Sequence, residues 1–452
     1  MEYVSLFLGA GFSDAALDEA LHRDLAFIGA DAGSIDAGPF QLAGQGSLFS
    51  ADLVRHDLGR ILPAARRLGI PLLIGSCGGS GRDAGVDEVA AMAREVAAEH
   101  GLTFTMALIY SELDRDYLKG KIADGRVRRL GGMRFDYTAE AVDAATRTVG
   151  VLGTEPFAAA LEAGADVVLA GRCTDPAIFA ALPLLSGVPP GVAWQAAKLA
   201  ECAGAVADPP RAELLHVTLA DDHFLVEPLG ADQRCTPASV GAQQLYETAD
   251  PLHSTEPSGV LDLTGAEYTA HDPRTTRITG GRFVPARQYT VKLEGVEPAG
   301  FQTVAMCSFD DPVLLADLPG WLAGAEREIA VKAARVYGAE ASGARLTIRP
   351  YGGGSGAALF AGAADGPARE VLLLVDVVAA RQPLATGIAN IAWHTLIHFP
   401  TKGWSGGLIT GAWPFAPPLI ERGPVHRFNV NHSIEVDDPC EVARTTLEQV
   451  GT

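Results

Sequence analysis

The sequence predicts an α/β protein, with an N-terminal, mostly parallel sheet of βα units followed by an α+β region that contains an antiparallel meander. Three observations support this fold class. Short, continuously apolar segments in the first half each end in a loop of small residues, and amphipathic segments lie between them. Apolar strands that alternate with helices are typical of parallel sheets, which are buried on both faces. After about residue 205, strands rich in Thr, Val and Tyr alternate with Gly-containing turns.

The expected parallel strands are the apolar runs at 3–9, 25–29, 70–75, 103–110 and 165–171. Residues 50–69 and 83–101 show the apolar spacing and polar starts of amphipathic helices. The carboxyl ends of parallel strands meet at one edge of an open sheet or one end of a barrel, where both architectures place ligand sites. We therefore expect the loops after these strands to form one rim, on either an open doubly wound sheet or a barrel.

The second half is expected to be α+β. Its predicted elements are a hairpin at 208–229, a meander at 259–295, a helix near 319–337, a strand at 345–350, a strand at 370–380, a helix near 384–398 and a last strand at 425–436. The change in pattern predicts two domains, an α/β domain at 1–204 and an α+β domain at 205–452.

Composition narrows the class of protein. The chain has 452 residues, 48% hydrophobic and 20% charged, as a globular enzyme would. Its net charge of −20 argues against nucleic-acid binding, which needs a basic surface. The longest apolar run is too short to cross a bilayer, so we expect a cytoplasmic protein without a membrane partner. Six scattered cysteines without CxxC spacing predict neither a disulfide framework nor a zinc cluster.

The segment GSCGGSGRD at 75–83 is the first candidate site, because it follows a strong strand and begins a helix. Glycines allow a ligand close to the backbone, and a helix N-terminus favours anions. We expect Gly78, Gly79, Ser80 and Gly81 to bind a phosphate, a carboxylate or an oxyanion, and we include Asp83 among the catalytic candidates. The alternative is a tight turn.

Two other functions for the same segment are weaker. Cys77 lies near the helix N-terminus, where a thiol becomes a better nucleophile, but no activating base is evident. The segment lacks the GK[ST] of a Walker loop. A match to GxGxxA at 79–84, with Glu112 beyond the next strand, leaves a dinucleotide site as the weakest option.

Two further loops complete the expected rim. Asp31 and Asp36, with Ser34 between them, lie in a loop of small residues after the second strand. These carboxylates suit general acid–base catalysis, binding of a divalent ion or hydrogen bonding to substrate, whereas the structural alternative is a local turn or cap. Arg172 follows the fifth strand and suits a carboxylate or phosphate clamp. Asp175, before Pro176, also fits a helix cap.

Other motifs give weaker evidence of function. His394 and His398 share one face of a helix, but the glutamate of HExxH is missing, so a zinc protease site is not expected. The Gly-rich segments at 351–356 and 402–407 suit either a mobile lid or ordinary turns.

Several of these segments together resemble the acyclic terpene utilisation (AtuA-like) family. The resemblance runs across nearly the whole chain and is carried by IGADAGSIDAGPFQL, RRLGIPLLIGSCGG, LEAGADVVLAGRCTDPAIFAALP, DHFLVEPL, RCTPASVGAQQLYE, GVLDLTGA and RFVPARQYTVKLEG. It implies a role in catabolism of branched acyl-CoA compounds and a small partner subunit related to a domain that many members carry. It also implies a small residue at the position of Cys77, which weakens a Cys77 nucleophile, and it includes His398 but not His394.

The leading functional hypothesis is a lyase, specifically a hydratase or dehydratase, that acts on a small hydroxy-carboxylic acid or a branched acyl-CoA. The amides at 78–81 and Arg172 would hold the substrate oxygens, while Asp31 or Asp36 would move protons. A Cys77-dependent acyl hydrolase or transferase and a non-catalytic ligand-binding or scaffold subunit are the alternatives. No cofactor is identified, a divalent metal stays open, and a homo-oligomer is expected.

Overall fold

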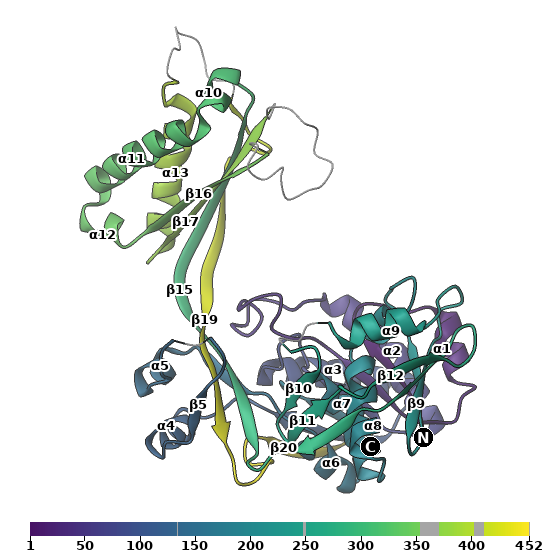
Figure 1. Ribbon diagram of the computed structural model, residues 1–452. Coiled ribbons are helices and arrows are strands. Elements are labelled where there is room, and N and C mark those ends of the chain that lie inside the picture. Colours follow the sequence, from purple (N-terminus) through teal and green to yellow (C-terminus); the bar gives the residue numbers. More distant parts are fainter. Residues whose placement is uncertain (133, 247–249, 353–369, 402–410, 452) are drawn as a thin grey trace. The chain divides into compact units, whose positions relative to one another are not determined.

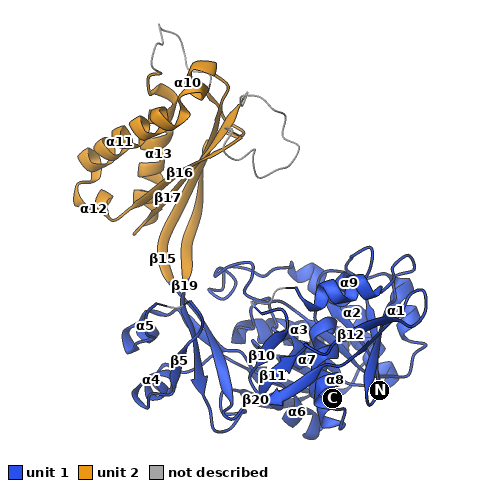
Figure 2. Ribbon diagram, in the orientation of Figure 1, with its two compact units in different colours: residues 1–297, 428–452 blue, residues 298–427 orange. Residues whose placement is uncertain are grey.

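The computed structural model describes residues 1–132, 134–246, 250–352, 370–401 and 411–451. The chain divides into two compact units: unit 1 holds residues 1–297 and 428–452, and unit 2 holds residues 298–427 (Figure 2). The predicted boundary after residue 204 is not one of these division points. The next strand along the chain, β8 (Leu215–Leu219), instead pairs antiparallel with β1 (Glu2–Phe7) in the main sheet of unit 1.

The main sheet of unit 1 has five adjacent parallel strands at its centre. In spatial order they are β1, β2 (Leu25–Asp31), β3 (Leu72–Gly75), β7 (Val167–Ala170) and β4 (Phe104–Tyr110). All five predicted parallel strands are therefore confirmed. In the described part of the chain, the sheet path ends at two unpaired edges, β12 (Glu267–Ala270) and β20 (Arg444–Val450), so the sheet is open and is not a barrel.

Helices cover both faces of this sheet (Figure 1). Alternate strand residues enter two cores: Val4, Ile28 and Leu72 pack with residues of α2 (Ala51–Leu68) and α3 (Asp83–His100). Tyr3, Phe27 and Leu73 pack instead with α6 (Glu155–Glu162), α7 (Asp175–Leu185) and α8 (Pro190–Ala200). Each fully buried large side chain contributes roughly 1.5–3 kcal/mol, which fixes the face that each residue presents. The α/β class and both predicted helices are thus confirmed, with helices packed on both faces of the parallel strands.

Antiparallel strands extend the sheet on both sides. On the β1 side they are β8, β9 (His223–Pro228), β13 (Thr276–Thr279) and β12, and on the β4 side β20 pairs with β4. The predicted hairpin is β8–β9, and β20 is a strand that the sequence pattern missed. The expected meander is split between two sheets, because β10 (His253–Glu256), β11 (Gly259–Asp262) and β14 (Arg282–Pro285) form a separate three-stranded sheet.

The other elements of unit 1 connect these layers. They are α1 (Asp14–Ala20), α4 (Arg115–Ala123), β5 (Val127–Arg129), α5 (Ala139–Ala144), β6 (Arg147–Gly150), the 3₁₀ helix η1 (Ala203–Val206) and α9 (Pro237–Gln244). Residues of α1 join the same core as α2 and α3.

Unit 2 is α+β, as predicted for the second half. Its sheet contains β16 (Arg345–Tyr351), β17 (Val371–Ala379) and parts of β15 (Thr290–Phe309) and β19 (Leu419–Glu435). Residues of α11 (Leu318–Tyr337) and α13 (Gln382–His398) pack with one face of β15 and β17 to form its core. The short elements are α10 (Pro312–Ala316), α12 (Ala339–Ser342) and β18 (Gly411–Ala412). Among the described residues, no helix has the length and apolar character needed to cross a membrane.

Candidate functional site

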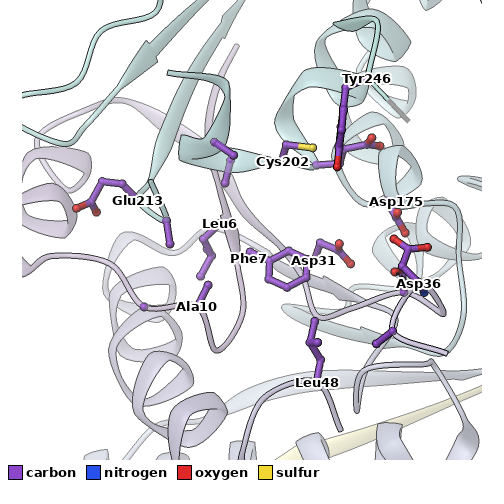
Figure 3. A pocket seen from close by; sticks show the side chains of 17 residues that line it. Leu6, Phe7, Ala10, Asp31, Asp36, Leu48, Asp175, Cys202, Glu213 and Tyr246 are labelled. Carbon is purple, nitrogen blue, oxygen red and sulfur yellow. Dashed lines mark hydrogen bonds between the residues drawn. The ribbon is translucent and has the colours of Figure 1, made fainter. Parts of the chain in front are cut away.

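A cavity of about 370 Å³ lies in unit 1 where the central parallel strands end (Figure 3). The end of β1, the loop after β2, the start of α7 and the turn after α8 all contribute to its wall. Apolar side chains include Leu6, Phe7, Leu48 and Tyr246, and the acidic ones are Asp31, Asp36, Asp175, Glu201 and Glu213. No lysine, arginine or histidine is among the described residues of the wall. The cavity therefore combines an apolar lining with an excess of carboxyl groups.

Asp31 is the last residue of β2 and is only 3% exposed. Its Oδ1 accepts a hydrogen bond from the Gly33 N–H at 3.2 Å, so part of its role is the local turn that its residue type favours. Burial and the nearby Asp175 carboxylate raise the pKa of Asp31 well above its ordinary value, against the opposing effects of the Gly33 N–H and Arg172. A carboxyl group with this environment favours its protonated form and suits a general acid.

Asp36 and Ser34 line the same cavity from the loop after β2. The Asp36 carboxyl group is exposed, and the Asp36 N–H donates to Ser34 Oγ at 3.2 Å, which closes a short turn. Figure 3 shows the carboxyl groups of Asp31, Asp36 and Asp175 on the same side of the cavity. The sequence prediction that these loops share one rim is correct for these three residues.

Asp175 and Arg172 form an ion pair beneath the cavity. Asp175 is the first residue of α7, and its Oδ1 accepts from Arg172 Nη1 at 2.9 Å. Arg172 also donates from Nε to Glu294 at 2.9 Å and from Nη1 to Ser76 Oγ at 3.1 Å. Arg172 is 7% exposed and does not line the cavity. Arg172, which the sequence predicted to bind substrate, is therefore hydrogen-bonded to other residues of the protein. It affects the cavity through its ion pair with Asp175.

Glu201 is a cavity residue that sequence reasoning missed. It caps the C-terminus of α8, and Lys198 of the same helix donates a hydrogen bond to its Oε1. Burial raises the pKa of Glu201 to about 8, with Asp175 and Glu256 adding to the shift and Lys198 opposing it. Nothing in the local sequence marks this position, since a Glu at the end of a helix is commonly a solvated surface residue.

The segment 75–83 packs against the other two loops through its glycines. A Cβ on Gly33 would lie 2.3 Å from the Gly79 carbonyl oxygen, and one on Gly81 would lie 2.0 Å from the Arg172 backbone nitrogen. Both glycines have positive φ, at 143° and 68°. The loops after β2, β3 and β7 thus pack backbone against backbone, as expected for loops that share one rim. The glycines make this close approach possible. Gly78, Gly79, Ser80 and Gly81 do not line the cavity.

At the N-terminus of α3, the side chain of Glu112 accepts a backbone hydrogen bond. Glu112 Oε1 accepts from the Asp83 N–H at 2.9 Å, and Asp83 Oδ1 accepts from the Glu112 N–H at 3.1 Å. Asp83 Oδ2 also accepts from Arg444 Nη2 at 2.9 Å. A carboxylate is favoured at this end of the helix dipole, so Asp83 and Glu112 tie loop to helix. The Asp83 N–H, one of the donors at this helix N-terminus, is thus engaged by Glu112.

Cys77 is fully buried, and burial raises the pKa of its thiol far above the ordinary value. Its sulfur contacts the Ile74 carbonyl oxygen at 3.8 Å. A nucleophilic cysteine needs an accessible thiolate. The Cys77-dependent hydrolase or transferase therefore lacks its chemical requirement. None of the six cysteines is in a disulfide bond.

The two histidines of the HTLIH segment belong to unit 2. On α13, the His394 and His398 rings stack with centroids 4.4 Å apart, and His398 Nδ1 lies 2.9 Å from the His394 carbonyl oxygen. Within the described ranges, no group of three or more His, Cys, Asp or Glu side chains is arranged to hold a metal ion. Residues 353–356 and 402–407 of the two Gly-rich segments lie outside the described residues.

Fold and site together define a doubly wound α/β protein with an acidic cavity at the carboxyl ends of its parallel strands. The sequence model for the acyclic terpene utilisation family protein AtuA matches residues 41–207 and 222–316, more than half of the chain, so the chain belongs to this family. The match includes Arg172, Asp175 and Glu201, whereas Asp31, Ser34 and Asp36 precede it. No curated protein and no solved structure matches the chain.

Proposed function

We propose that the chain is a hydratase or dehydratase that acts on a branched acyl-CoA or a small hydroxy-carboxylic acid in catabolism. One observation carries the proposal: Asp31, a buried carboxyl group whose protonated form is favoured, faces an otherwise largely apolar cavity beside the exposed Asp36. Removal of water needs a proton donor for the departing hydroxyl and a base for the adjacent C–H, and two carboxyl groups in unlike environments supply that pair.

In the dehydration direction, Asp36 takes the proton from the carbon next to the carbonyl group. The electrons of that C–H bond form the C=C bond, and the C–O bond of the β-hydroxyl breaks. Asp31 gives its proton to the leaving oxygen, so that water departs and Asp31 is left ionised. Addition of water follows the same path in reverse, and solvent returns both carboxyl groups to their starting states.

The composition of the cavity and the family support a branched aliphatic substrate. Leu6, Phe7 and Leu48 provide an apolar wall, and a cavity of about 370 Å³ falls within the usual range for small-molecule sites. The family is named for the utilisation of acyclic terpenes, which are branched molecules, and a branched acyl substrate fits that role. The small partner subunit and the homo-oligomer are further proposals that rest on the resemblance and on the usual symmetry of metabolic enzymes.

The test is mass spectrometry of branched 3-hydroxyacyl and 2-enoyl thioesters, and of the matching free hydroxy acids, incubated with the protein in ¹⁸O-labelled water. We expect the enoyl compounds to gain one water with ¹⁸O in the new hydroxyl group, and the hydroxyacyl compounds to lose one water. Asp31→Asn should reduce the rate by about 10²–10⁴-fold. Asp24→Asn, the same substitution just before the amino end of β2, should leave the rate unchanged. Normal turnover in both Asp31→Asn and Asp36→Asn, or no exchange with any compound, contradicts the proposal.

A further inference from the structure

The Glu201 side chain, at the wall of the cavity, has one oxygen atom without a hydrogen-bond partner among the described residues. The side chain is 8% exposed, and Lys198 engages its Oε1. Its Oε2 is buried and has no hydrogen-bond partner among the described residues. A buried polar atom without a partner is costly, and such atoms in native proteins are usually satisfied by water or by a ligand. Glu201 is also one of the residues that line the cavity, so its carboxyl group lies next to the space that a bound molecule would occupy.

The charges around Glu201 determine its protonation. The ionisable neighbours are Lys198 on α8, Cys202 just after it, Asp175 on α7, Asp31 at the end of β2 and Glu256 on β10. Lys198 pairs with Glu201, while Arg172 and Lys292 contact Glu294, and Arg172 also contacts Asp175.

Five buried or half-buried carboxyl groups thus lie near three cations. The carboxyl groups are those of Asp31, Asp175, Glu201, Glu256 and Glu294, and the cations are Arg172, Lys198 and Lys292. Two carboxyl groups are therefore in excess. Ionising all of them would leave net negative charge inside the protein, so protons are retained. The directions of the pKa shifts agree with this excess of carboxyl groups. Glu294, between two cations, has a lowered pKa, whereas the pKa of Glu256 is raised to about 7 and that of Glu201 to about 8. At neutral pH the Glu201 carboxyl group thus favours the form that donates a hydrogen bond.

The backbone also holds this turn in an unusual conformation. Ala203, two residues after Glu201, has a φ of 45°, and it lines the same cavity. In the described part of the chain the only other non-glycine residue with positive φ is Ser76, which accepts a hydrogen bond from Arg172 beneath the site. Such conformations cost energy and cluster at functional sites.

We propose that Glu201 is the oxygen-binding acid of the cavity, and that its O–H donates a hydrogen bond to the carbonyl oxygen of an uncharged acyl group, a thioester rather than a free carboxylate. This inference rests on the proposed function and narrows its substrate class. It gives Glu201 the role expected of the 78–81 amides, which do not line the cavity, and of Arg172, which has internal partners. When the carbon next to the thioester loses its proton, negative charge develops on the carbonyl oxygen, where a fixed donor stabilises it. A free carboxylate would add charge to a cluster that already has an excess.

The test measures binding of two probes, the N-acetylcysteamine thioester of 3-methylbutanoic acid and 3-methylbutanoate itself, by calorimetry. We expect the thioester to bind more tightly than the acid. Glu201→Ala should weaken thioester binding by about tenfold, the usual worth of one hydrogen bond. Glu201→Gln, which keeps an N–H donor of the same shape, should retain binding at neutral pH.

The pH profile separates a donor from a merely structural residue. The acid donates below its pKa of about 8, so wild-type affinity should fall as the pH rises through that value. In Glu201→Gln the affinity should not change there. Should Glu201→Ala fail to fold, as judged by circular dichroism, the Glu201→Gln profile alone decides the question.

Three outcomes overturn the proposal: unchanged thioester binding in Glu201→Ala, the same pH profile in wild type and Glu201→Gln, or tighter binding of the free acid. Failure of the proposed function looks different. If the 3-methylbutanoyl thioester binds with the expected pH profile but the 3-hydroxyacyl and 2-enoyl thioesters neither lose nor gain water, the hydro-lyase assignment fails and the Glu201 site stands. If water exchange proceeds normally in Glu201→Ala, the hydro-lyase assignment stands and the Glu201 site fails.

Discussion

The loops after β2 and β3 are made of similar residues but are used in opposite ways. Both are rich in Gly and Ser, both follow buried parallel strands, and both contain an acid. The loop at 31–38 exposes its carboxyl groups to a cavity. In the loop at 75–83, the glycines pack against the backbone of neighbouring loops, and the Glu112 side chain accepts a hydrogen bond at the N-terminus of α3. A glycine-rich loop at a strand end is therefore a ligand site only where its neighbours leave the space open.

The largest effect should come from Arg172, which contacts Ser76 of the 75–83 loop and Asp175 in the cavity wall. Arg172→Met leaves Glu294 buried without its main cation and releases Asp175. We expect a loss of about 3–5 kcal/mol in the free energy of unfolding, the usual cost of breaking a buried ion pair from one side. Urea unfolding at neutral pH measures it.

The control is the double variant Arg172→Met with Glu294→Gln, which removes both charges. It should recover part of the lost stability, because no unpaired carboxylate is then left in the interior. A loss below about 1 kcal/mol in the single variant, the size of a surface ion pair, would mean that Arg172 is free to bind substrate after all.

An intermediate effect should come from Gly81 in the filled loop. Gly81→Ala places a methyl group 2.0 Å from the Arg172 backbone nitrogen at a φ of 68°. We expect a loss of roughly 3 kcal/mol from strain and overpacking together. Thermal and urea unfolding of the variant test this value.

Gly187→Ala is the matched control, since Gly187 has a similar φ of 83° and no atom within 4 Å of the new methyl group. It should lose only the conformational cost of about 1–2 kcal/mol. Equal losses in both variants would contradict the packing role that we assign to the glycines of the 75–83 loop.

The smallest effect should come from Cys77. Cys77→Ala removes one buried atom and should cost roughly 1 kcal/mol in stability. Turnover in the water-exchange assay should be unchanged, because the thiol has no path to substrate and burial disfavours its thiolate. Iodoacetamide should not label Cys77 in the folded protein, and a peptide map identifies any modified cysteine. Rapid labelling together with loss of turnover in Cys77→Ala would restore the nucleophile hypothesis.

The pattern of the sequence by itself determined the central parallel strands and the position of three site residues, Asp31, Asp36 and Asp175. Continuous apolar runs can be buried only as central strands, and their carboxyl ends bring Asp31 and Asp36 to the same edge as Asp175. The five parallel strands and the rim follow from this local information. The AtuA family match agrees with the resemblance carried by these segments.

Only the tertiary structure decided which groups face the cavity. Glu201 lies 170 residues after Asp31, and its place in the site depends on how α8 packs on the sheet. Arg172 was expected to face substrate, but Glu294, 122 residues further along the chain, takes its Nε. β20 pairs with β4 more than 300 residues away. Burial, ion pairing and protonation arise from such distant contacts, so local residue patterns could identify the edge of the sheet but not which side chains remain free for a ligand.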